Sequence, residues 1–171
     1  DAKGLLNAAI EDPNPVLFFE HKYLYRSLKE EVPEAYYTTE IGKANLVSTG
    51  DDLTIITYGL GVHWAVKEMQ NRPEIQAEII DLRSLVPLDT ETIYASVKKT
   101  GRAIVLHEDC ISGGIGGELT ALITEHCFEY LDAPVLRVGS LNSPVPFAAT
   151  IEAIFLPQDR FTKAVDQLLN Y

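Results

Sequence analysis

The sequence predicts an α/β protein in which a largely parallel sheet is covered by helices on both faces. Short apolar runs with many β-branched residues alternate with segments in which apolar residues recur three and four positions apart. Strands separated by helices favour parallel pairing, because a crossover helix returns the chain to the end of the sheet at which the previous strand began. We expect the four parallel strands at 53–57, 77–82, 103–107 and 134–138.

The elements expected before this alternation are a helix end and a short strand. Residues 4–10 have the pattern of the last turns of a helix, and the apolar run 16–19 is typical of a strand. Residues 21–43 show no regular pattern, but their tyrosines offer apolar area, so we expect a linker laid against a surface. A possible edge strand follows at 44–48.

The later helices have recognisable ends. Asp89 is the expected N-cap of a helix that carries two lysines in its last turn and ends at Gly101. The longest helix is expected to open near Gly116 and to run to about Leu131, with His126 on its apolar face. A final amphipathic helix is expected at 159–169.

Composition limits the partners that the chain could have. It carries 14 Lys and Arg against 25 Asp and Glu, a net charge of −11. This charge argues against nucleic acid or an anionic membrane and leaves room for a basic protein partner. No apolar run reaches the length of a membrane span, so we expect a soluble chain. The start DAKGLLNAAI lacks an initiator methionine, so we expect a piece of a longer protein.

The glycine-rich segment HEDCISGGIGGE, residues 107–118, is the clearest candidate site. It follows a strand and opens a helix, where α/β proteins often bind ligands. Its spacing matches neither a dinucleotide fingerprint nor a P-loop, which favours a tight packing turn over a nucleotide site. His107, Glu108, Asp109 and Cys110 alternate in direction along an extended chain, so they are not expected to converge on one metal.

Other polar residues have simpler interpretations. Asp81 and Arg83 end a strand and are expected to tie down neighbouring loops. His63 and His126 are expected to be core or boundary histidines. No G-x-S-x-G elbow surrounds a serine, which argues against a serine hydrolase. Cys110 and Cys127 lack metal or redox spacing and are expected to be reduced core thiols.

Several segments in one order resemble the β subunit of thiamine-diphosphate-dependent 2-oxoacid dehydrogenases of the branched-chain type. They are NPVLFFEHKYLYR (14–26), EIIDLRSLVPLDTETIYASVKKTGR (78–102), HEDCISGGIGGE (107–118), LDAPVLRV (131–138) and SPVPFA (143–148). The resemblance implies that residues 1–20 end a pyrimidine-binding domain, that 21–43 link two domains, and that 44–171 form a transketolase C-terminal domain. It also implies a three-layer α/β/α fold whose five-stranded, mostly parallel sheet has one antiparallel edge strand, at 44–48.

The function implied is that of the decarboxylating component of a 2-oxoacid dehydrogenase complex, an oxidoreductase that transfers an acyl group to lipoamide. Thiamine diphosphate and magnesium would be bound by regions absent here, so we expect no catalytic residue, metal or cofactor on this fragment, and no activity from it alone. The partners implied are an α subunit or α half, a second β copy and the lipoyl acyltransferase core. Bacterial cytoplasm is preferred over the mitochondrial matrix.

The resemblance assigns roles to three groups of residues. His21 and Arg26 would border the substrate channel. His107, Glu108, Gly113 and Gly114 would lie at a subunit interface. Glu129, Asp132 and the expected natural end at Tyr171 would form an acidic docking surface for a basic domain of the acyltransferase. The alternative is a stand-alone flavodoxin-like module that holds a small anion at the glycine turn 113–117.

Overall fold

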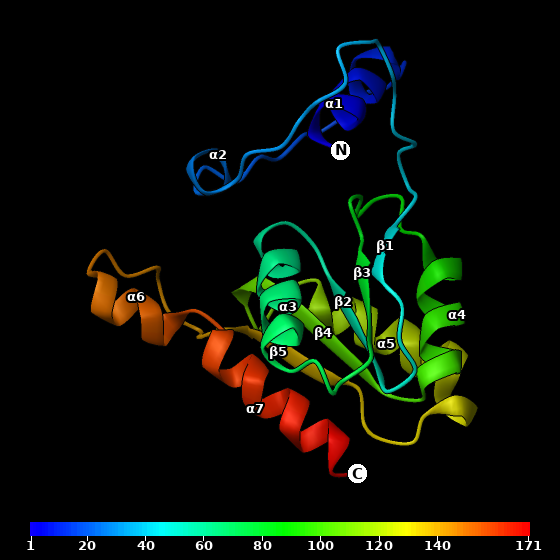
Figure 1. The fold of residues 1–171 in the computed structure, drawn as a ribbon, viewed down its shortest axis with the longest axis vertical. Coiled ribbons are helices and arrows are strands. Elements are labelled where there is room, and N and C mark those ends of the chain that lie inside the picture. Colours follow the sequence, from blue (N-terminus) through cyan, green and yellow to red (C-terminus); the bar gives the residue numbers. More distant parts are fainter.

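A five-stranded sheet forms the centre of the computed structural model, which describes residues 1–171 (Figure 1). The strand order is β1-β3-β2-β4-β5; β2 pairs in parallel with β3 and β4, β4 pairs in parallel with β5, and β1 is an antiparallel edge strand on β3. The fold class expected from the sequence is therefore confirmed. The strands are β1 (Asn45–Ser48), β2 (Leu53–Thr57), β3 (Ala77–Asp81), β4 (Ala103–Cys110) and β5 (Leu136–Ser140).

Two pairs of helices cover the sheet, one pair on each face. One core cluster joins β2, β3 and β4 to α3 and α7 through residues such as Ile55, Ile104 and Phe161. The other joins the opposite face to α4 and α5 through residues such as Ile56, Val97 and Ile123. The helices are α1 (Ala2–Glu11), α2 (Leu24–Ser27), α3 (Leu60–Asn71), α4 (Thr90–Thr100), α5 (Gly116–Cys127), the 3₁₀ turn η1 (Phe128–Tyr130), α6 (Ala149–Phe155) and α7 (Gln158–Leu169).

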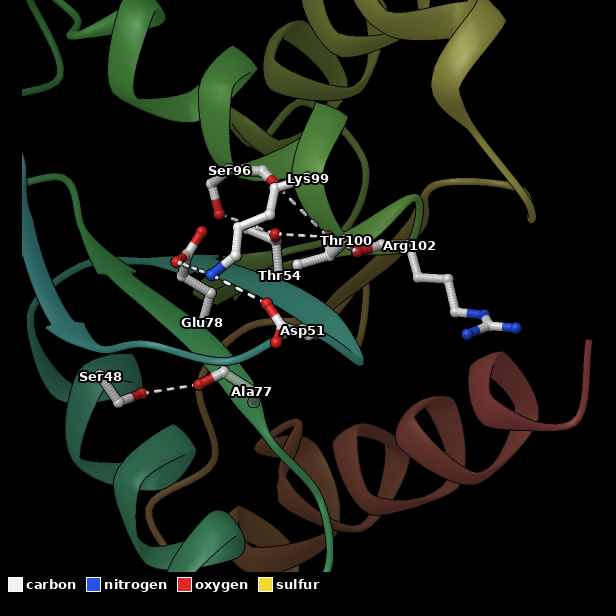
Figure 2. A network of polar contacts seen from close by, with 9 residues as sticks. All are labelled: Ser48, Asp51, Thr54, Ala77, Glu78, Ser96, Lys99, Thr100 and Arg102. Atoms are coloured by element: carbon white, nitrogen blue, oxygen red, sulfur yellow. Dashed lines mark hydrogen bonds and ion pairs between the residues drawn. The ribbon is translucent and has the colours of Figure 1, made fainter.

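The ends of α4 follow the sequence prediction. Asp89 is the N-cap, and its carboxylate accepts a hydrogen bond from the Thr92 amide at 3.2 Å. Gly101 ends the helix with φ of 67°, in the left-handed region where glycine is favoured. A hydroxyl network then holds α4 on the sheet: Thr54 Oγ1 lies 2.8 Å from the hydroxyls of both Ser96 and Thr100 (Figure 2).

The structure corrects several element predictions. Residues 16–19 form no strand, because no neighbouring strand within this chain pairs with them. The α-helical part of the long helix ends at Cys127, and the 3₁₀ turn η1 continues it to Tyr130, close to the predicted end near Leu131. Phe128 is 72% exposed, so the apolar sequence pattern extends past the residues that are buried. Strand β5 begins two residues later than expected, and the seven-residue α6 was not predicted.

Two residue-level expectations are also wrong. His126 is exposed and packs its ring against Tyr94, with centroids 4.8 Å apart, instead of lying on the buried face. Cys110 is half-buried at the end of β4, where its thiol contacts the Leu141 carbonyl at 3.2 Å, so only Cys127 is a core thiol.

Residues 1–43 lie to one side of the sheet and outside its core, as expected for residues 1–20 (Figure 1). Gly4 is the only buried residue of α1, and Leu17 and Phe19 are 84% and 88% exposed. Residues 21–43, the predicted linker, are irregular apart from α2. None of the helices has the length and apolar character needed to span a membrane.

Candidate functional site at the carboxyl edge of the sheet

The parallel strands β2 to β5 all end at one edge of the sheet, and polar side chains gather there. Residues 1–43 lie on the same side of the molecule (Figure 1). Because this edge also carries the glycine turn 113–117, it is the natural place to look for a site. The residues at or just after the strand ends are Tyr58, Asp81, Arg83, Glu108, Asp109 and Leu141.

His21 and Glu108, predicted separately for the channel and for an interface, are in direct contact. Nε2 of His21 lies 2.8 Å from Oε2 of Glu108, and both side chains are about one-third exposed. The contact joins the linker to β4 across 87 positions of sequence.

Tyr58, which sequence reasoning did not single out, belongs to the same cluster. Burial raises the pKa of its phenol, and the nearby carboxylates of Asp109 and Glu108 raise that pKa further. The phenol therefore stays a neutral hydrogen-bond donor beside two acidic groups. Its position directly after β2 is the sequence signal that could have identified it.

A second polar contact ties the start of the chain to the β3 end. Arg83 donates to the carboxylate of Asp1 at 2.6 and 3.0 Å, and its amide donates to Oδ1 of Asp81. Burial raises the pKa of Asp81, although Arg83 acts against this shift. Arg83 adopts a φ of 56°, unusual for a residue with a side chain. Arg83 thus holds the start of the chain, and Asp81 holds the backbone just after its own strand.

His107 is held beneath the glycine turn instead of facing outward. Its side chain is 1% exposed, and a Cβ added at Gly114, Gly116 or Gly139 would lie within 2.8 Å of the imidazole. These three glycines therefore make the space that the ring fills. Burial lowers the pKa of His107, so the imidazole is neutral at pH 7. The Asp109 backbone acts against this shift, but neither ring nitrogen has a hydrogen-bond partner of normal geometry within the chain.

The remaining predicted residues lie elsewhere or stand alone. Arg26 is exposed in α2, and Gly113 is exposed with φ of 80° and open space around it. Glu129 and Asp132 are exposed at the other end of the sheet, where the parallel strands begin. There the Asp132 amide donates to the Gly101 carbonyl. Tyr171 is 62% exposed and lies at that same lower end (Figure 1). The roles predicted for these residues stay predictions.

The donor groups present do not fit a magnesium diphosphate. No three His, Cys, Asp or Glu side chains lie close enough to hold a metal ion together. Two grooves border β5, and each includes Arg137; neither is enclosed as a cofactor site would be. No chemical step through thiamine diphosphate can be assigned to these residues.

Comparison with known proteins identifies the family to which this fold belongs. The transketolase C-terminal domain family matches residues 42–160, so the chain belongs to that family. Among solved structures, a split-gene transketolase described as an inactive β4 tetramer superposes with a TM-score of 0.64 and 27% identity, over 81% of this chain and 46% of that one.

More particular relatives are β subunits of 2-oxoacid dehydrogenases of both the branched-chain and the pyruvate type, which confirms the resemblance to such β subunits. The 2-oxoisovalerate dehydrogenase subunit beta of Bacillus subtilis (strain 168) is 45% identical over 100% of this chain and 54% of its own length. The pyruvate dehydrogenase E1 component subunit beta of the same strain is 48% identical over 94% of this chain and 50% of its own length. The chain spans about half the length of these curated relatives.

Proposed function

We propose that this chain is the C-terminal part of the β component of a decarboxylating 2-oxoacid dehydrogenase. The parent enzyme would convert a 2-oxo acid and lipoamide to acyl-dihydrolipoamide and CO₂, using thiamine diphosphate. The part described here would serve subunit assembly and docking of the acyltransferase core. Its relatives are β subunits of such dehydrogenases, which supports the proposal.

Exposed apolar side chains outside the core are the observation that carries the assembly role. They occur in residues 1–43 and again around α6, which extends away from the sheet (Figure 1). Exposed apolar surface on this scale is typical of a protein interface. The most exposed of these residues are Ile10, Leu17, Phe19, Tyr36, Phe147 and Ile154.

A titration separates this proposal from the stand-alone module. The 171-residue chain, exposed to thiamine diphosphate with magnesium, to flavin and to nucleotides, should bind none of them tightly. The same chain, produced together with the proposed α partner and the rest of the β subunit, should enter a larger assembly in sedimentation analysis. Tight binding of thiamine diphosphate by the isolated chain would contradict the proposal that other regions of the parent enzyme bind the cofactor.

Branched-chain 2-oxo acids are the substrates that we propose for the parent enzyme. The segment FFEHKYLYR and the pair His107–Glu108 favour that branch over the pyruvate branch, and the structure brings His21 of the former against Glu108. Steady-state rates of the intact enzyme should therefore give a higher kcat/KM for 2-oxoisovalerate than for pyruvate. A preference for pyruvate would overturn the assignment.

The active-site mouth is a separate proposal for the linker. We propose that His21 and Arg26 border the path of the substrate or the lipoyl arm. Because His21 is held by Glu108, the exposed guanidinium of Arg26 is the group better able to meet a carboxylate. His21 would then set the position of the linker instead of contacting the substrate.

Docking of the acyltransferase is proposed for the lower end of the domain, at Glu129, Asp132 and Tyr171. An acidic surface should speed association with a basic domain and make binding salt-sensitive, because charges are screened over about 8–10 Å at physiological ionic strength. We predict that Asp132→Lys, or a short extension after Tyr171, weakens acyltransferase binding without unfolding the domain, measured by calorimetry at low salt.

The matched control for docking is Glu31→Lys, which makes the same charge change at an exposed linker position. It should leave the affinity within about twofold and the salt dependence unchanged, since a single exposed charge contributes little by itself. Equal weakening by both variants would indicate a general charge effect, and unchanged affinity with Asp132→Lys and the extension would remove this surface from consideration.

A further inference from the structure

The first turn of α5 presents backbone donors that have no acceptor in the protein. The Gly117 amide donates to the Gly114 carbonyl, but the amides of Gly116 and Glu118 donate to no protein atom. The preceding amides of Gly113, Gly114 and Ile115 also lack protein acceptors. Free amides and the helix dipole together make such a turn attractive to an anion. Most helices have free amides at the N-terminus, so these amides alone do not define a binding site.

His107 supplies independent evidence from below the turn. A Cβ added at Gly116 would lie 2.6 Å from its Nε2, and one added at Gly114 would lie 3.2 Å away, so this nitrogen faces the inner side of the turn. The side chain is 1% exposed and both nitrogens lack partners. An unpaired buried polar group is unfavourable and calls for an explanation. An acceptor seated at the turn would pair with the ring N–H and reduce this cost.

Arg137 adds a positive charge beside the same turn. It lies on β5, is exposed, and forms no ion pair within the chain. Its Nη1 would lie 3.5 Å from a Cβ at Gly117, so the guanidinium reaches the first turn of α5. Gly117 and Arg137 also border an open groove of about 550 Å³ along α5, with Thr120, Ala121, Thr124 and Glu125.

The charges around the groove decide where in it an anion could bind. Glu125 lies two helical turns beyond Gly117 and would repel an anion at the far end. Glu118 is also acidic, but its side chain is exposed to solvent and does not border the groove. The favourable position is therefore the end at Gly117, where the free amides and the guanidinium meet.

We propose that the turn 113–117 and Arg137 bind a small oxyanion of the phosphate type. The backbone amides and the guanidinium would donate to its oxygens, and the neutral His107 would support the turn from beneath and offer the remaining donor. The glycines would be required because side chains at 114 and 116 would collide with the imidazole. This site goes beyond the proposed assembly role and does not depend on it, since it uses only residues of this domain.

Calorimetric titration of the 171-residue chain with inorganic phosphate tests the proposal. Ionic strength is held constant with chloride, so that general screening does not contribute. We expect saturable binding in the millimolar range, and phosphate density at the first turn of α5 in crystals grown with it. An absence of saturable binding, or density only at other positions, would overturn the proposal.

Two pairs of variants make the test specific. Arg137→Gln should weaken phosphate binding at least tenfold, whereas Lys163→Gln, which removes the same charge from α7, should change it less than twofold. Gly117→Glu should abolish binding by placing its own carboxylate beside Arg137. Gly117→Ala is the control for the backbone, because a Cβ there meets only Arg137, at an ordinary 3.5 Å.

The pattern of the four variants decides between specific and general effects. Equal losses in Arg137→Gln and Lys163→Gln would show that phosphate responds only to overall charge and would contradict the site. Retained binding in Gly117→Glu would do the same. Circular dichroism of each variant verifies folding, and the Arg137 pair still decides the question if a glycine variant does not fold.

Discussion

Thr54 and Thr57 lie on the same buried strand, but their hydroxyls are in opposite situations. Thr54 Oγ1 is 2.8 Å from the hydroxyls of Ser96 and Thr100, which fasten α4 to the sheet (Figure 2). Thr57 Oγ1 is buried without a partner. Both are fully buried threonines of β2, so a sequence pattern cannot distinguish them.

We therefore predict opposite effects for one substitution at two positions. Thr54→Val should lower the free energy of unfolding by about 1–3 kcal/mol, because it leaves buried hydroxyls without their partner. Thr57→Val should change stability by less than about 0.5 kcal/mol or increase it, because no hydrogen bond is lost. Urea unfolding of both variants measures the difference, and equal destabilisation would contradict the assigned network.

At the scale of elements, Asp89 joins two parts of the chain. Its carboxylate caps α4 through Thr92 and accepts the amide of Ala44 at 3.1 Å, next to the start of β1. Burial acts to raise the pKa of Asp89, but these hydrogen bonds and Lys43 outweigh burial and hold the pKa below its ordinary value. The stabilisation by the charged form is therefore complete above the unfolded-state pKa and is lost as pH falls through the lower folded-state pKa.

Asp89→Ala should cost about 1–3 kcal/mol at pH 7, because the helix loses its cap and the Ala44 amide loses its acceptor. Asp89→Asn should cost less, because asparagine also caps helices. The difference in stability between the unsubstituted chain and Asp89→Asn should shrink as the pH falls below about 4, where the unfolded carboxyl becomes protonated. Chemical unfolding at pH 7, 5 and 3 measures it; a pH-independent difference would argue against a charged cap.

Helix ends with caps could be predicted, whereas ends set by burial could not. Asp89 and Gly101 were predicted because a capping side chain and a left-handed residue act locally. The end of α5 at Cys127 has no such signal: apolar residues continue the helical pattern, but Phe128 turns to solvent. The run 16–19 likewise has strand propensity, but propensity forms no strand without a neighbouring strand.

At the scale of the whole molecule, residues 1–41 are attached to the domain by few interactions. Both core clusters lie within residues 53–168, and the ties from the N-terminal part include His21–Glu108 and Asp1–Arg83. Partly exposed ion pairs of this kind contribute about 0–1 kcal/mol each. The sheet and its four covering helices should therefore fold without that part.

We predict that a chain of residues 42–171 folds cooperatively, with a free energy of unfolding within about 2 kcal/mol of the 171-residue chain. A chain of residues 1–156 is the control; it should not fold, because it lacks α7 and with it the buried Phe161, Val165 and Leu168. Guanidinium unfolding followed by circular dichroism measures both. Failure of 42–171 to fold would show that the N-terminal segment is integral to the domain.

The sequence by itself determined the fold class, the family resemblance and most strand positions. The fold class, the resemblance and the strand positions depend on local periodicity, caps and short motifs. Such features can be predicted because they depend on residues that are close in sequence. Only the tertiary structure placed His21 against Glu108, or set His107 beneath three glycines beside Arg137. Such contacts join residues from separate elements, and the packing of helices on the sheet fixes their distances, which no local pattern encodes.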